Sequence, residues 1–178
     1  MSELINAYEG IKPYIPYHKT TVQMPEVVHY LKSVGVGIEI VRSAYIMFRN
    51  ESGNGTAGIN NNYIGAQADS GKWDEKWNSR IVGIVRKIEG RTGKERLFLA
   101  FDSYKTSLDL LLDRVEKRGI FVGRFAHKVA KLDIENSIDL CRAYYKEWVT
   151  GKRDYEPTNS EMKDFLSMYA QSEKIFVA

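Results

Sequence analysis

The chain has 178 residues, and 43% of them are hydrophobic, which is enough for one globular domain with a buried core. Its formal net charge is +3, and the basic and acidic residues are mixed along the chain, which disfavours a nucleic-acid-binding protein. The single cysteine, Cys141, excludes an internal disulfide, and no apolar run is long enough to span a membrane.

Residues 1–22 are predicted to form an extended lead-in. Pro13 and Pro16 lie in a tyrosine-rich stretch, and prolines at this spacing disfavour a helix. Two interpretations stay open for the tyrosines: they dock on the domain itself, which we favour, or on a partner.

Two helices are predicted next. The first starts near Pro25 and ends at Gly35. The second runs from Ile38 to Asn50, and its apolar residues recur at the spacing of one buried helical face, namely Val41, Ala44, Tyr45 and Phe48. This helix would hold the residue that follows it, Glu51, on a packed scaffold.

The remaining elements are a hairpin and further helices. Residues 52–72 form a Gly- and Asn-rich stretch, whose backbone either binds a sugar or belongs to an ordinary surface loop. Residues 81–89 and 95–101 are predicted to be antiparallel strands. Helices are expected from Ser103 to Gly119, from Ile134 to Gly151 with Cys141 in its core, and from Ser160 onward after a linker over residues 152–159.

Glu51 opens a glycine-rich turn where the second helix ends. A cation would suit a helix C-terminus better, because the helix dipole is negative there. Together with apolar neighbours, that position is expected to raise the pKa of the Glu51 carboxyl group. A carboxyl group that stays protonated near neutral pH can protonate the leaving oxygen in the hydrolysis of a glycosidic bond. The alternative is a solvated residue at a helix end.

Three short elements, in order, resemble the glucosaminidase family of peptidoglycan hydrolases. They are Glu51-Ser-Gly-Asn-Gly-Thr, Asn62-Tyr63-Ile64-Gly65 and Phe101-Asp102-Ser103-Tyr104. The resemblance covers roughly residues 25–150 and implies an α+β, lysozyme-like fold over residues 23–151, mainly α-helical with a small β-hairpin lobe. It also implies that Glu51 is the general acid of an endo-β-N-acetylglucosaminidase acting on the β-1,4 bonds of peptidoglycan glycan strands.

The resemblance also implies a second acidic residue on the hairpin lobe. Glu89 matches its position, Glu95 is a competitor, and either can be an ordinary hairpin charge. The expected substrate-binding positions are Asn62, Tyr63, Gly65, Trp73, Asp102, Tyr104 and Phe125.

Some of these positions have a second interpretation or depart from the family motif. Trp73 and Trp77 either stack on sugar rings or lie in the core, and we expect core for one of them. Asp102 is equally well explained as a helix-capping carboxylate. Phe125 and His127 replace a Tyr and a Thr of the family, so a hydroxyl group is lost at Phe125.

Other classes of function stay open. A muramidase or a lytic transglycosylase would use the same Glu51, and a non-catalytic wall-binding or virion structural module would keep only the fold. No cofactor and no metal are expected, because His18, His29 and His127 are scattered and lack cysteine partners. The N-terminus lacks the order of a signal peptide. We therefore expect a bacteriolytic protein that reaches the cell wall by phage lysis, in a virion or as a secretion-system effector, with the terminal segments available to such a partner.

Overall fold

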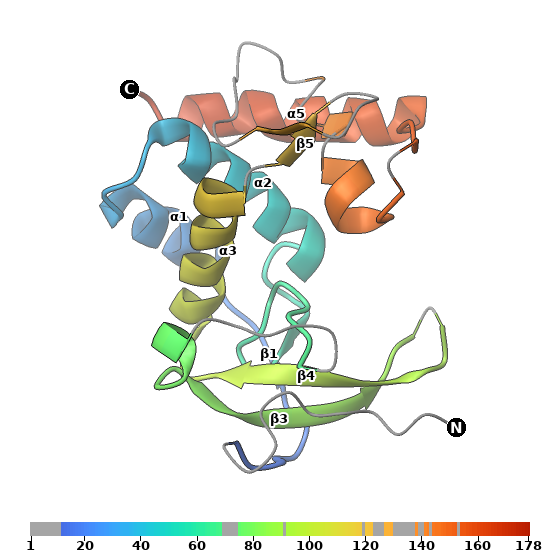
Figure 1. The fold of residues 1–178 in the computed structure, drawn as a ribbon. Helices are drawn as coiled ribbons and strands as arrows, with labels where there is room; N and C mark the ends of the chain where they lie inside the picture. Colours follow the sequence, from blue (N-terminus) through green and yellow to red (C-terminus); the bar gives the residue numbers. More distant parts are fainter. Residues whose placement is uncertain are drawn as a thin grey trace. The chain divides into compact units, whose positions relative to one another are not determined.

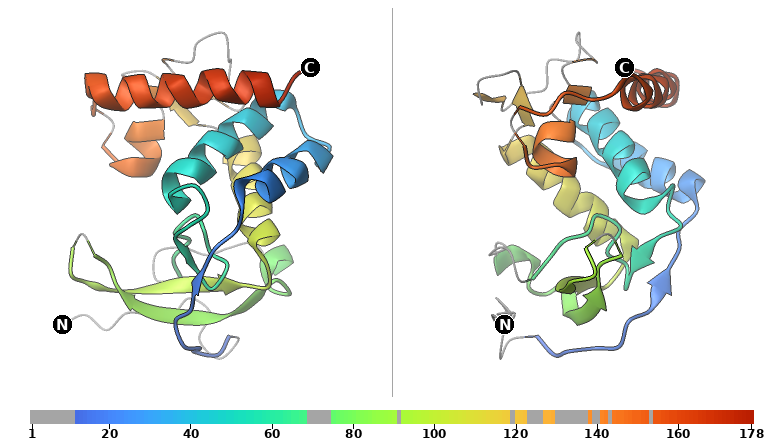
Figure 2. Two further views of the ribbon diagram at one scale, coloured as in Figure 1. Left: turned by 180° about the vertical axis from the view of Figure 1, so that it is seen from behind. Right: turned by 90° about the vertical axis from the view of Figure 1, so that its right-hand side faces the viewer.

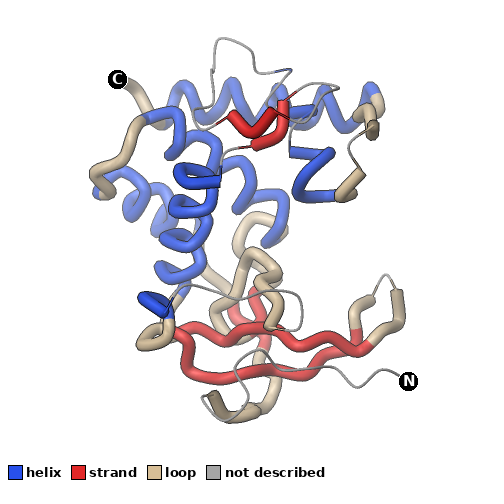
Figure 3. Tube along the Cα trace, viewed as in Figure 1, coloured by secondary structure: helices blue, strands red, loops and turns tan. Residues whose placement is uncertain are grey.

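The computed structural model describes residues 12–68, 75–90, 92–118, 120–122, 127–129, 138, 141–142, 144–152 and 154–178. The chain forms two compact units (Figure 1). Unit 1 is Met1–Met24 with Asn50–Leu108, and unit 2 is Pro25–Arg49 with Asp109–Ala178. Helices and small antiparallel two-stranded sheets make the fold α+β, as predicted (Figure 3). None of the described helices is both long and apolar enough to cross a membrane.

A long hairpin dominates unit 1. Strand β3 (Ile81–Ile88) pairs antiparallel with strand β4 (Glu95–Phe101) (Figure 2). Ile84 lies opposite Leu99, and Lys87 lies opposite Arg96. Both predicted strands are confirmed, and the first is one residue shorter than expected. The side chains of Ile84 and Leu99 are fully buried, which explains why this β-branched and aromatic segment forms strands.

The lead-in docks on the hairpin. Ile84 N–H donates to the carbonyl oxygen of Pro13 at 2.8 Å, and Ile15 N–H donates back to the carbonyl oxygen of Ile84 at 2.9 Å. Further along, strand β1 (Lys19–Thr20) pairs with strand β2 (Gly58–Ile59). A Cβ atom on Gly83 would lie 2.9 Å from the Ile15 side chain, so the glycine permits this close approach. The backbone of the lead-in is therefore paired with unit 1, whereas the side chains of Tyr14 and Tyr17 remain exposed.

Unit 2 is built from helical segments. Helix α1 is Met24–Ser33, helix α2 is Ile38–Ser52, helix α3 is Tyr104–Arg118 and helix α5 is Asn159–Ile175. Helices α2 and α3 each continue from one unit into the other. The predicted apolar face of α2 is buried, and the core of unit 2 contains Val27, Leu31, Val41, Ala44, Tyr45, Phe48, Phe165, Tyr169 and Phe176.

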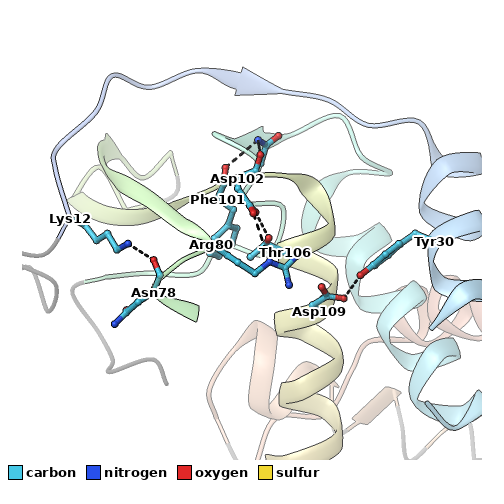
Figure 4. Close-up of polar contacts among 9 residues, drawn as sticks. Lys12, Tyr30, Asn78, Arg80, Phe101, Asp102, Thr106 and Asp109 are labelled. Atoms are coloured by element: carbon cyan, nitrogen blue, oxygen red, sulfur yellow. Dashed lines mark hydrogen bonds and ion pairs between the residues drawn. The ribbon is translucent and has the colours of Figure 1, made fainter. Parts of the chain in front are cut away.

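Polar contacts connect the helical segments of unit 2 and cap one of them. The Tyr30 hydroxyl group donates to Asp109 Oδ1 at 2.5 Å (Figure 4). Arg42 donates through Nη2 to the carbonyl oxygen of Phe176 at 2.6 Å, after the end of α5. Thr158 and Glu161 form a capping box at the start of α5, one residue before the predicted start at Ser160.

The segment between α3 and α5 differs from the prediction. Strands β5 (Ile120–Val122) and β6 (His127–Val129) pair there, although the sequence analysis predicted no strand in this segment. Part of the helix predicted from Ile134 to Gly151 lies outside the described residues, and Tyr144–Val149 form a π-helix, η2. Cys141 is buried, as expected for a small core residue.

Candidate active site

Glu51 lies in the last turn of α2 and is half-buried. The sequence placed the end of this helix at Asn50, whereas the helix continues to Ser52. The extension follows from the turn: the carbonyl oxygen of Ser52 accepts hydrogen bonds from Thr56 N–H at 3.0 Å and from Ala57 N–H at 2.9 Å. These bonds satisfy a helix-end carbonyl group that would otherwise be exposed.

The turn after Glu51 needs the residue types that occupy it. Gly53, Asn54 and Gly55 all have left-handed backbone conformations, with φ of 55°, 58° and 82°. Glycine and asparagine adopt this conformation at the lowest cost. The Ser52 hydroxyl group accepts from Gly55 N–H at 2.8 Å, and the Thr56 hydroxyl group donates to the carbonyl oxygen of Gly53 at 2.8 Å. Each residue after Glu51 therefore helps to fix the turn.

The lead-in holds this turn from outside. Val22 N–H donates to the carbonyl oxygen of Gly55 at 2.9 Å. A Cβ atom on Gly55 would collide with the carbonyl oxygen of Val22, so only glycine fits at residue 55. No local sequence signal indicates this role of the lead-in.

Asn62 and Tyr63 are supports inside unit 1. Each is only 1% exposed. The Asn62 side chain donates to the carbonyl oxygens of Ala66 and Leu99, both at 2.8 Å, and accepts from Ala66 N–H at 3.0 Å. Tyr63 N–H donates to the Ser107 hydroxyl group at 3.0 Å. This burial does not support the expected contact of either side chain with a substrate.

The two preceding asparagines have comparable roles. The buried Asn60 side chain accepts from His18 N–H at 2.7 Å and donates to the carbonyl oxygen of Pro16 at 3.0 Å. Asn61 donates to the carbonyl oxygen of Phe101 at 3.2 Å. Both have left-handed backbones, with φ of 47° and 63°. The run of three asparagines was the sequence signal that could have indicated these contacts. Its side chains connect the lead-in, the loop and β4.

Neither interpretation of residues 52–72 expected how much of the described part is buried. Gly58, Asn60, Ala66, Ala68 and residues 62–64 are buried. Gly65 is exposed with φ of 63°, and a Cβ atom there would meet nothing within 4 Å. Gly65 therefore offers an accessible backbone next to a buried loop.

Asp102 connects β4 to α3. Its carboxylate accepts from the Thr106 hydroxyl group, and Arg80 Nε lies 3.9 Å from its second oxygen (Figure 4). The carboxylate is 44% exposed, so it also remains accessible to a ligand. Tyr104 is the first residue of α3 and is half-buried. Asp102 therefore lies just before the start of α3, and its bond comes from the Thr106 side chain, whereas a helix cap accepts from a backbone N–H.

Glu89 lies at the hairpin turn, in the same unit as Glu51. Its carboxylate accepts from the Thr92 hydroxyl group at 2.5 Å, and Arg96 Nε lies 4.0 Å from it. Glu95 is more exposed, with Arg86 Nη1 at 3.5 Å. Of the two candidates, Glu89 is the one held by the turn itself.

Of Trp73 and Trp77, the structure describes only Trp77. Trp77 is 7% exposed, and Lys76 Nζ lies 4.9 Å from the centroid of its ring. It is therefore a core residue, which agrees with the expectation of core for one of the two. Trp73 and Phe125 lie outside the described residues. Within the part of the chain that the structure describes, no group of three or more His, Cys, Asp or Glu side chains is arranged to hold a metal ion.

Comparisons with known proteins give two similar structures. No family model matches the sequence. No curated protein matches it either. The chain is similar to a solved structure of a peptidoglycan hydrolase from Sphingomonas sp. A1, at 17% identity over 87% of this chain and 91% of that chain, with a TM-score of 0.44. A mutant of a peptidoglycan hydrolase from the same organism gives 17% identity, 86% and 93% coverage, and a TM-score of 0.42.

Proposed function

We propose that the protein is a lysozyme-like peptidoglycan hydrolase that cleaves β-1,4 bonds of the glycan strand, with Glu51 as the general acid. The observation that carries the proposal is the construction of the turn after Glu51. Ser52, Gly55 and Thr56 fix this turn through their own hydrogen bonds. The same residues form the motif that resembles the glucosaminidase family, so the motif has a physical purpose, which is to hold one carboxyl group at a helix end.

The chemistry needs one proton donor and a way to stabilise the sugar cation. The negative end of the α2 dipole favours the neutral form of the Glu51 carboxyl group. That group gives its proton to the glycosidic oxygen as the bond to the anomeric carbon breaks. Water then attacks the anomeric carbon and loses a proton to a base. Glu89 would supply this base or stabilise the oxocarbenium ion, and the acetamido group of the substrate is the alternative nucleophile.

The remaining site residues have proposed supporting roles. Asp102, Tyr104 and the backbone at Gly65 are the proposed substrate contacts among the described residues, because each is at least partly exposed. Asn62 and Tyr63 would instead position the loop that carries Gly65. Trp73 and Phe125 stay candidate contacts, and delivery to the wall by a phage, a virion or a secretion system stays a prediction.

Digestion of purified peptidoglycan by the wild-type protein and by Glu51→Gln, followed by mass spectrometry of the products, tests the proposal. We expect new reducing N-acetylglucosamine ends from the wild type and roughly 10²–10⁴-fold less product from Glu51→Gln. The matched control is Glu39→Gln, in the exposed first turn of the same helix, which should digest normally. Thermal unfolding shows whether both variants are folded.

The products also separate the alternatives. Reducing muramic ends would identify a muramidase, and anhydro-muramic ends would identify a lytic transglycosylase, both with Glu51 retained as the acid. Equal digestion by the wild type and Glu51→Gln would contradict the role of Glu51. No product from several wall types would favour the non-catalytic binding module.

A further inference from the structure

Two exposed tyrosines on the lead-in each lie against a cation from β3. Tyr14 is 48% exposed and Tyr17 is 43% exposed. The guanidinium carbon of Arg86 lies 4.7 Å from the ring centroid of Tyr14, and Lys87 Nζ lies 4.8 Å from that of Tyr17. All four residues belong to unit 1. We call them the tyrosine–cation patch.

The backbone under the patch is fixed. Tyr14 forms a parallel bridge with Ile84, and the next residue, Ile15, packs its side chain on Gly83. On either side of Tyr17, the carbonyl oxygen of Pro16 and the N–H of His18 are both hydrogen-bonded to the Asn60 side chain. The rings are therefore presented by a segment that is already ordered, which lowers the entropy lost when a ligand binds.

The surroundings of the patch are basic. Residues 12–25 contain Lys12, His18 and Lys19 and no Asp or Glu. Strand β3 contains Arg86 and Lys87 and no acidic residue, and Glu89, which follows the strand, lies 4.0 Å from Arg96 Nε. On the neighbouring strand, Glu95 lies 3.5 Å from Arg86, and both side chains are about half-exposed, so solvent weakens this ion pair. The surface is therefore complementary to an anionic ligand.

An anionic sugar strand combines the two chemistries that the patch offers. The apolar face of a pyranose ring stacks on a tyrosine ring, and carboxylates of the peptide stems pair with Arg86 and Lys87. We propose that the tyrosine–cation patch is a second, non-catalytic binding surface for the anionic glycan strands of peptidoglycan. The identity of this glycan rests on the proposed function. A polyphosphate would leave the tyrosine rings unused, and a neutral glycan would leave the cations unused.

Pull-down on purified sacculi tests the patch. The sacculi are stripped of attached phosphate polymers, and every variant carries Glu51→Gln to prevent digestion. In this background, Tyr14→Ala with Tyr17→Ala should bind roughly tenfold more weakly. Tyr14→Phe with Tyr17→Phe should bind like the parent, because the rings remain. Arg86→Ala with Lys87→Ala should bind more weakly and lose most of the salt dependence of binding. The control for net charge is Lys32→Ala with Lys174→Ala, both exposed residues of unit 2.

Several results would overturn the proposal. One is unchanged binding by Tyr14→Ala with Tyr17→Ala, and another is an equal loss of binding by Tyr14→Phe with Tyr17→Phe. The proposal also fails if the protein binds only sacculi that keep their phosphate polymers, or if patch-dependent binding is stronger for single-stranded nucleic acid than for sacculi. If the alanine pair is unfolded, Tyr17→Ala alone replaces it, since the backbone bonds of Pro16 and His18 do not involve the Tyr17 side chain.

The outcomes keep the two proposals separate. If wild-type protein digests no peptidoglycan while sacculi binding depends on the tyrosines, the proposed hydrolysis fails and the patch stands. If Glu51→Gln abolishes digestion while the alanine pair binds sacculi like its parent, the patch fails and the hydrolase stands.

Discussion

The backbone N–H of Val22 donates a 2.9 Å hydrogen bond to the carbonyl oxygen of Gly55, four residues after Glu51. This bond connects an N-terminal extended segment to the turn that positions the proposed acid. The turn also contains three successive left-handed residues, so its geometry depends on outside support as well as on local sequence.

Gly55→Ala should therefore destabilise the protein strongly. The substitution adds left-handed strain of about 1–3 kcal/mol. It also adds a collision with Val22 that costs about a further 1–3 kcal/mol. Gly65→Ala is the control, because residue 65 is left-handed but has open space around its Cβ position, and it should cost only about 1–2 kcal/mol. Urea unfolding measures the free energy of unfolding of both variants. An equal decrease in the two would contradict the role of the Val22 contact.

Asn62→Ala should also destabilise the protein. It removes the donor to the carbonyl oxygen of Leu99 and the acceptor of the Ala66 N–H, both of them buried. Each unsatisfied group costs about 1–3 kcal/mol, so for two groups we expect a loss of about 2–6 kcal/mol in the free energy of unfolding. The control is Asn50→Ala, at an exposed helical position, which should change the free energy of unfolding by less than about 0.5 kcal/mol. A small effect of Asn62→Ala would show that the loop is held by other contacts.

The two hairpin carboxylates should differ in kinetics. On the proposed mechanism, Glu89→Gln lowers kcat by roughly 10²-fold, and Glu95→Gln leaves it near the wild-type value. Both are isosteric and both lie beside an arginine, so each controls for the other. Release of soluble muropeptides over time gives the rates. The reverse order would assign the second role to Glu95, and two unaffected variants would favour the acetamido group as nucleophile.

Stability should fall in alkaline solution because of two groups in unit 2. Burial, reinforced by Glu161, raises the pKa of Cys141 to about 12 and that of Tyr145 to about 12. In the unfolded chain these groups lose their protons near about pH 8.5 and about pH 10. The unfolded state therefore binds fewer protons, so the free energy of unfolding decreases as the pH rises from about 8.5 toward about 12.

Urea unfolding at a series of pH values measures this decrease. Cys141→Ala should make the decrease smaller above about pH 8.5, and Tyr145→Phe should do so above about pH 10. Below about pH 8 the slope with pH should be the same for wild type and both variants. An unchanged alkaline slope in both variants would show that other groups cause the loss.

Periodicity predicted the regular elements well. The buried residues of α2 were identified because apolar side chains recur at helical spacing, and β4 was placed with both of its ends because a glycine-containing turn precedes it. The capping box of α5 was less obvious, and the helix starts one residue early because Thr158 supplies the cap. Strands β5 and β6 were missed because each has only three residues, too few for an alternating pattern.

The supports of the candidate site were beyond the reach of sequence patterns. Asn60 and Asn62 look like residues of an exposed polar loop, yet their partners lie 42 and 37 residues away, at His18 and Leu99. A buried asparagine and a solvated one have the same local sequence signal. Glu51 became the candidate acid because its helix, its turn and the motif that resembles the glucosaminidase family are local features, and its role stays a proposal. Its placement inside the helix depended on hydrogen bonds to the Ser52 carbonyl group.

The division of the chain into interleaved units has a consequence for biosynthesis. The chain passes between unit 1 and unit 2 three times, so each unit consists of two separated segments. During translation the lead-in leaves the ribosome before Gly55 and Ile84, the partners that it needs, exist. Tyr45, on the apolar face of α2, must likewise wait for Phe176, whose ring centroid lies 5.4 Å from its own. Nascent chains should therefore expose apolar surface until Phe176 has been synthesised, and a chain truncated before Phe176 should be a chaperone substrate rather than a smaller folded protein.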